Sequence, residues 1–337
     1  MTVIQLPSRL LARRRAEKQL WEGRRHVVAL DPERAEDALR DAWQSARESG
    51  SVELAAEVGE ELYQVLLRRR HVDEAIPVLE QMVILRARRH GGNPESGAAW
   101  RNELIQRLGQ LGRYAEAEPL CRARLESARR RRPPDARAVG FAEVTLAWCV
   151  RSLGRWEEAE RLSREAVAVL DGEAVPRGSV GWALAGLAAV LLRRMALDEA
   201  ELALKRAAED WTSVGRAELA AGIDEQLMDL YVVGERHQDA LAVSEAALNR
   251  TRRGAAALVD RERQLRNLDR HAFLLSAAGR VAEAARYELR AGYLRQAVDA
   301  QRRAGDGASL DPSGPVFVGE PLLDWSLPGM AVAPRAC

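Results

Sequence analysis

The chain has 337 residues, of which 47% are apolar and only 5% aromatic, and Ala, Leu, Arg and Glu dominate it. Its 51 basic and 50 acidic residues leave a net charge of +1, which argues against a nucleic-acid binder with one basic face. This composition favours helices over strands, and the length suits a repeat array better than a single compact domain.

The N-terminal segment, MTVIQLPSRLLARRRAEK, is interrupted by arginines before an apolar signal-peptide core is long enough. No uncharged apolar run approaches the roughly 20 residues that span a bilayer. Cys121, Cys149 and Cys337 form no CxxC pair, which suits a reducing compartment. We therefore expect a cytoplasmic protein that does not bind membranes.

Two helices are predicted at the start of the chain, over roughly residues 8–26 and 32–49. Asp31 is the expected N-cap of the second helix, and Pro32 is expected in its first turn. This pair matches the later repeat poorly, as a terminal unit with one face toward water should. We treat residues 1–50 as a divergent N-terminal cap.

From residue 51 onward one ten-residue pattern recurs. The copies are RHVDEAIPVL (70–79), GRYAEAEPLC (112–121), GRWEEAERLS (154–163), MALDEAELAL (195–204), ERHQDALAVS (235–244) and GRVAEAARYE (279–288). The alanine that they share recurs at intervals of 42, 42, 41, 40 and 44 residues. A period in this range indicates a solenoid of helix pairs.

Each part of the pattern has a structural reason. Gly112, Gly154 and Gly279 stand where one helix ends and the next begins, and glycine permits the left-handed backbone of such a turn. The shared alanine allows two helices to approach closely. Pro77 and Pro119 follow that alanine by two residues, which we expect to lie near the first turn of the second helix.

The predicted fold is an all-α, right-handed α-solenoid of about fourteen helices in seven antiparallel pairs. The solenoid proper covers residues 51–304. The helical pattern stops after about Gln301, and residues 305–337 are rich in Gly and Pro, which predicts an irregular or disordered tail.

The pattern resembles the tetratricopeptide repeat in its longer form of about 42 residues, over roughly residues 50–300. GRYAEAEPLC is most similar to the repeats of kinesin light chains, in which Gly-x-Tyr precedes EAEPLC. The resemblance implies a groove in which Asn side chains of the first helices hold a peptide backbone. Only Asn102 falls on such a position, and the equivalent places carry Val144, Ala185, Glu225 and Asp269. In bacteria the same repeats serve as sensor and docking arrays beside many effectors.

The period also predicts which first-helix residues line this peptide-binding groove. One turn apart on the inner face lie Asn102 and Gln106, Val144 and Trp148, Ala185 and Ala189, Glu225 and Asp229, and Asp269 and Phe273. This surface would run from neutral polar through apolar to acidic. Trp148 is either an anchor for the peptide or core between adjacent repeats, and both readings stay open.

Motifs for catalysis or for cofactors are absent from the sequence. The five histidines, His26, His71, His90, His237 and His271, form no HExxH motif and no spaced cluster with cysteine, which argues against a zinc site. No phosphate-binding loop and no GxSxG motif occurs. Cys121 and Cys149 fall on helical stripes and are expected to be buried. We predict no catalytic residue, no metal and no cofactor.

Two arginine runs, Arg68–Arg70 and Arg129–Arg132, have two readings. Phosphate or RNA contacts are one. Solvated loops balanced by nearby acids are the other, and we favour it because no aromatic residue is interleaved with the runs.

The C-terminal tail carries EPLLDWSLPGM, with Leu322, Leu323, Asp324 and Trp325 as candidate docking residues. Kinesin light chains bind peptides with a tryptophan beside acidic residues, which LLDW resembles. Three roles stay open: a cap over the array, an inhibitor in the groove, or a docking element for a partner.

The sequence thus predicts a non-enzymatic adaptor, scaffold or sensor subunit that binds a protein or peptide, its own tail included. One alternative is an array that presents its tail as a peptide substrate to a modifying or cleaving enzyme. A weaker alternative is an RNA-binding accessory protein. The oligomeric state does not follow from the sequence.

Overall fold

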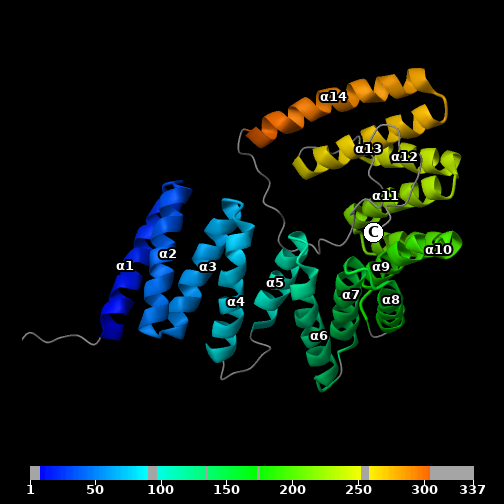
Figure 1. The fold of residues 1–337 in the computed structure, drawn as a ribbon. Coiled ribbons are helices and arrows are strands. Elements are labelled where there is room, and N and C mark those ends of the chain that lie inside the picture. The colour runs from blue at the N-terminus through cyan, green and yellow to red at the C-terminus, as the bar shows by residue number, and fades with distance from the viewer. Residues whose placement is uncertain (1–7, 90–96, 134, 173–174, 252–257, 304–337) are drawn as a thin grey trace, which may run out of the picture. The chain divides into compact units, whose positions relative to one another are not determined.

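The computed structural model describes residues 8–89, 97–133, 135–172, 175–251 and 258–303. Within these ranges the chain forms fourteen α-helices and no strand (Figure 1). The helix bounds are α1 Ser8–Val28, α2 Pro32–Ser49, α3 Val52–Arg68, α4 Val72–Arg89, α5 Ala98–Gln110, α6 Tyr114–Arg130, α7 Ala136–Ser152, α8 Trp156–Leu170, α9 Val180–Arg193, α10 Leu197–Ser213, α11 Ala217–Val233, α12 His237–Thr251, α13 Leu258–Ala277 and α14 Val281–Arg303. The predicted all-α fold of seven helix pairs is confirmed.

The chain divides into two compact units, residues 1–124 and 125–337, and the division falls within α6. The expected boundaries at residues 50 and 304 follow the repeat pattern instead, and they stay a prediction.

In the first unit each helix from α1 to α4 packs against the next along the chain, and α1 also contacts α3. The entry to α2 is as predicted. Asp31 caps the helix by accepting a hydrogen bond from the backbone N–H of Arg34 at 3.2 Å, and Pro32 is the first helical residue. Gly50 ends the helix with a φ of 72°.

In the second unit the first helices α7 and α9 pack on their partners α8 and α10, and α13 packs on α14. Because α9 also contacts both α7 and α11, these first helices form a continuous layer (Figure 1). The core between the helices is built mainly from Leu, Ala and Val, and it includes the fully buried Trp211. An array of this kind is held together by contacts between neighbouring helices.

The helix starts confirm the repeat. The second helices α4, α6, α8, α10, α12 and α14 begin at intervals of 42, 42, 41, 40 and 44 residues, the same as the intervals between the shared alanines. Those alanines are 0–2% exposed: Ala75, Ala117, Ala159, Ala200, Ala240 and Ala284. A side chain larger than a methyl group would separate the helices at these points.

The turns between paired helices share one geometry. Gly112, Gly154 and Gly279 have φ angles of 70°, 79° and 76°, as predicted for a left-handed helix end. After Gly112 the N–H of Arg113 donates to the carbonyl of Leu108 at 2.8 Å, which closes the turn. The other repeats make the same turn with non-glycine residues, among them Met195 at a φ of 60°.

The placement of two prolines differs from the prediction. Pro77 and Pro119 are each the sixth residue of a helix, α4 and α6, and so lie in the second turn. There a proline removes one intrahelical hydrogen bond. Both prolines are exposed, so the carbonyl that loses its partner lies on the side where water can replace it.

Candidate functional site

Buried polar side chains gather where α11 meets α13 in the second unit. Glu225 and Asp229 lie one turn apart on α11, and Arg270 lies opposite them on α13. The Arg270 guanidinium is 3% exposed, and its Nη1 lies 2.7 Å from Glu225 Oε2. Its Nη2 lies 3.8 Å from Asp229 Oδ1. A single buried arginine therefore joins two buried carboxylates across the seam between two first helices.

Two buried carboxamides lie on the same two helices. Asn267 lies one turn before Arg270 on α13, and Gln226 follows Glu225 on α11; both are buried. The side-chain oxygens Asn267 Oδ1 and Gln226 Oε1 accept no hydrogen bond, although both atoms are shielded from solvent. A buried acceptor without a donor costs on the order of 1–3 kcal/mol, so such atoms need a reason to persist. We call these five residues the α11–α13 polar cluster.

The acids predicted at one end of the groove lie beside arginines. Arg270 pairs with Glu225 and Asp229, and Arg266 Nε lies 3.6 Å from Glu225. Asp269 is paired too, with Arg295 of α14 at 2.8 Å. The period of the first helices picked out the acids alone. It did not include the arginines, because two of them lie at other positions on α13 and the third lies on a second helix.

The remaining predicted groove residues lie on two other helices. Asn102 and Gln106 are half-buried on α5 in the first unit. Val144 and Trp148 are buried on α7 in the second unit, and Val144 belongs to the same apolar core as Trp182 and Ala185. Among the predicted groove residues, Glu225 and Asp229 both contact Arg270. The groove assignment itself stays a prediction. The tail residues Leu322, Leu323, Asp324 and Trp325 lie outside the described residues.

Asn267, Gln226 and Arg270 were missed by the sequence reasoning. The groove prediction took one residue per turn of each first helix, in the repeat position of Asn102, and on α13 that position is Asp269. Asn267, Gln226 and Arg270 lie at other positions, and the signal that points to them is their residue type, Asn, Gln or Arg, on a first helix.

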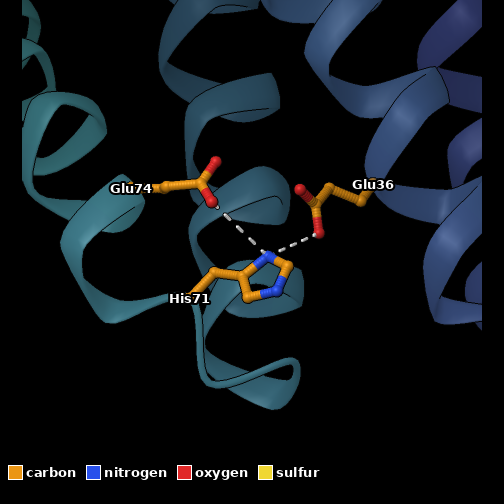
Figure 2. Close-up of side chains that lie close together, drawn as sticks. All are labelled: Glu36, His71 and Glu74. Atoms are coloured by element: carbon orange, nitrogen blue, oxygen red, sulfur yellow. Dashed lines mark ion pairs between the residues drawn. The ribbon is translucent and has the colours of Figure 1, made fainter.

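A second cluster lies in the first unit, where α2, α3 and α4 meet. His71 Nδ1 lies 3.2 Å from Glu36 Oε2 and 3.8 Å from Glu74 Oε1 (Figure 2). Glutamate and histidine are both metal ligands, and the three side chains are close enough to share one ion. The sequence analysis considered HExxH motifs and histidines spaced with cysteine. It did not identify this group, whose members lie on α2, in the turn before α4 and on α4.

Two arginines donate hydrogen bonds to the carboxylates of this cluster. Arg40 donates to Glu36 Oε1 at 2.6 Å and also to Glu74, while Arg69 donates to Glu36 Oε2 at 2.8 Å. Burial opposes ionisation of Glu36, but the hydrogen bonds from Arg40 and Arg69 outweigh it and lower the pKa of Glu36. A divalent cation here would sit beside two guanidinium groups, so the residues fit an ion-pair clamp between helices better than a metal site.

The other candidates from the sequence are accounted for locally. Cys121 and Cys149 are buried, as predicted. In the two arginine runs, Arg69 pairs with Glu33 and Glu36, and Arg129 pairs with Glu143 and Glu165. These contacts favour the reading of charged loops balanced by nearby acids. Among the described helices, none is long and apolar enough to cross a membrane.

Comparison with known proteins supports the repeat assignment. Residues 95–171 match the family model described as tetratricopeptide repeat. None of the curated proteins matches the chain. Among solved structures, BtubC (BKLC) from P. vanneervenii is 19% identical over 68% of this chain and 92% of its own, with a TM-score of 0.60.

Two further solved structures show the same fold. A tetratricopeptide repeat protein from Parabacteroides merdae is 14% identical, covers 87% of this chain and 100% of its own, and has a TM-score of 0.55. The apo form of the quorum sensor NprR from B. thuringiensis is 13% identical over 82% of this chain and 75% of its own, with a TM-score of 0.51. At these identities the likeness concerns the fold, and it confirms the tetratricopeptide repeat recognised from the sequence.

Proposed function

We propose that this chain is a non-enzymatic adaptor that binds an extended peptide segment of a partner protein across the first helices of its second unit. The observation that carries the proposal is the α11–α13 polar cluster, in which Asn267 Oδ1 and Gln226 Oε1 are buried without a hydrogen-bond donor.

The chemistry of the cluster suits a peptide backbone. A carboxamide offers both an acceptor and a donor, and it can bind the N–H and C=O of one extended residue together. The two carboxylates, of Glu225 and Asp229, already have two guanidinium groups beside them, those of Arg270 and Arg266. A neutral backbone is therefore a better ligand than a free ion. The apolar stretch around Val144 and Trp148 would then receive side chains of the same peptide.

Tetratricopeptide repeats most often act as scaffolds, and NprR, which shares the fold, is described as a quorum sensor. These likenesses support protein or peptide binding in general. Neither the tail-substrate alternative nor the RNA-binding alternative has an observation among the described residues that favours it.

A peptide library selected on the full chain, followed by fluorescence anisotropy with the selected peptides, tests the proposal. Asn267→Leu and Gln226→Leu remove the two orphaned acceptors without changing side-chain size greatly. We expect each to weaken peptide binding about tenfold, the loss that follows when one buried hydrogen bond to the ligand is removed. Because those oxygens accept no hydrogen bond in the free protein, the melting temperature should stay equal or rise.

Asn249→Leu is the matched control, since Asn249 is exposed on α12 whereas both cluster carboxamides are buried. It should leave peptide affinity unchanged. Selected peptides that bind the two cluster variants as tightly as the unaltered chain would refute the site, and a library that yields no binder would refute the function.

A further inference from the structure

The last helix, α14, has apolar residues on two opposite faces. One face packs on α13 through Ala284, Ala291 and Val298, all buried. The opposite face follows the helical spacing through Ala282, Leu289, Tyr293, Ala297 and Ala300, and all five are exposed. Leu289 is 61% exposed and Tyr293 is 66% exposed. We call these five residues the outer stripe of α14.

The repeat itself shows that this stripe is unusual. Leu289 stands five residues after the shared alanine. The same position in the five preceding repeats is always charged and exposed: Glu80, Arg122, Arg164, Lys205 and Glu245. In the preceding repeats this position of the second helix is therefore a solvated charge. In the repeat that ends with α14 the same position carries a large apolar side chain.

A terminal helix of a repeat array normally needs a polar outer face to keep the array soluble. An exposed row of Leu and Tyr on that helix instead indicates a surface that something covers. The chain itself supplies a candidate, because 34 residues, 304–337, follow α14 directly.

The tail matches the stripe in composition and charge. It contains Phe317, Leu322, Leu323, Trp325 and Leu327, and its only basic residue is Arg335, against four acids, Asp306, Asp311, Glu320 and Asp324. On the helix side, the exposed Arg286 and Arg290 flank Leu289. An acidic, apolar segment therefore meets an apolar row edged by arginines.

The tail is also long enough to reach the stripe. Leu289 lies fourteen residues before the end of α14, or roughly 21 Å along a helix at about 1.5 Å per residue. The nineteen residues from 304 to 322 can span roughly 60 Å when extended. A tethered segment also binds at a high effective concentration, so a weak contact suffices.

We propose that residues 304–337 fold back over the outer stripe of α14 and act as the C-terminal cap of the array. Leu322, Leu323 and Trp325 would lie on Leu289 and Tyr293, and the acids of the tail would lie near Arg286 and Arg290. Such a cap is independent of the peptide site on α11 and α13.

Photo-crosslinking in the full chain tests this placement, with p-benzoylphenylalanine in place of Tyr293. After irradiation and trypsin digestion, mass spectrometry should find the α14 peptide joined to the tail peptide within one chain. The same amino acid in place of Leu202, which is 69% exposed on α10, is the control and should give no tail crosslink. A crosslink from position 293 to a second copy, or to any helix but not to the tail, would overturn the proposal.

A second measurement follows the tail by limited chymotrypsin cleavage at its aromatic and leucine residues. Leu289→Glu should speed cleavage within residues 304–337 about tenfold, the change that losing one buried leucine contact implies. Leu289→Met should retain the slow rate, and Leu202→Glu should not change it. Equal cleavage rates in the Leu289→Glu variant and the unaltered chain would show that the stripe does not hold the tail.

Discussion

Replacing Arg270 tests whether the α11–α13 polar cluster is an interior charge network. Arg270→Met keeps the aliphatic bulk of the side chain and removes the charge. Glu225 and Asp229 then stay buried one turn apart without the contact to Arg270, while Arg266 still lies 3.6 Å from Glu225. Two like charges in a buried site repel each other, and both have lost their contact with the same cation.

The size of the effect follows from the burial of the three side chains. Removing one partner of a buried ion pair typically costs about 3–5 kcal/mol, because the other charge stays buried without compensation. Arg266 offsets part of this loss, so we expect a value near the lower end, about 3 kcal/mol. For a unit of this size, about 2–4 °C is lost per kcal/mol, which predicts a fall in melting temperature of roughly 6–12 °C.

Thermal unfolding followed by far-UV circular dichroism measures this fall. Arg280→Met is the matched control, because Arg280 and Glu283 form an exposed pair at 2.8 Å on one helix turn. A fully exposed pair contributes little to stability, so the control should shift the melting temperature much less than Arg270→Met does. The triple variant Glu225→Gln, Asp229→Asn and Arg270→Met should recover most of the loss, since no buried charge remains. Equal shifts for Arg270→Met and Arg280→Met would refute the reasoning.

Two further predictions concern stability. Ala159→Trp should destabilise the second unit by about 1–3 kcal/mol or more, because Ala159 is fully buried and a larger side chain forces its neighbours apart. Ala168→Trp, on the exposed side of the same helix, is the control and should not destabilise it. An unchanged melting temperature for Ala159→Trp would place that residue away from a helix contact. For Glu201, burial opposes ionisation, but hydrogen bonds from Lys205 and Arg236 prevail and lower its pKa to about 2. Because the folded pKa lies below the unfolded value, the carboxylate stabilises the fold above about pH 4.5, and this stabilisation is lost as the pH falls toward 2. Urea unfolding should therefore show Glu201→Gln to be less stable than the unaltered chain at pH 6, by a margin that shrinks severalfold at pH 2.5. A margin as large at pH 2.5 as at pH 6 would contradict the assignment.

The sequence by itself determined the repeat, and through it most of the fold. The alanine at intervals of 40–44 residues marks a helix contact that only a small side chain permits, so the residue type alone indicates the close packing. The glycines of the turns likewise indicate a left-handed backbone, since glycine adopts positive φ angles more readily than any other residue; they are Gly112, Gly154 and Gly279. Each of these features depends on one residue and its place in the repeat, so the sequence is enough to predict it.

What the tertiary structure decided was which side chains from different helices meet. Arg270 is forty-one residues from Asp229 and forty-five from Glu225, and the sequence pattern alone does not show that it contacts both. His71 reaches Glu36 in the same way, across a turn and a neighbouring helix (Figure 2). The structure also decided in which turn of α4 Pro77 lies, because this depends on the helix beginning at Val72, which the repeated sequence pattern does not fix. Charge compensation across helices depends on distances of a few ångströms, and only the packed structure sets those distances.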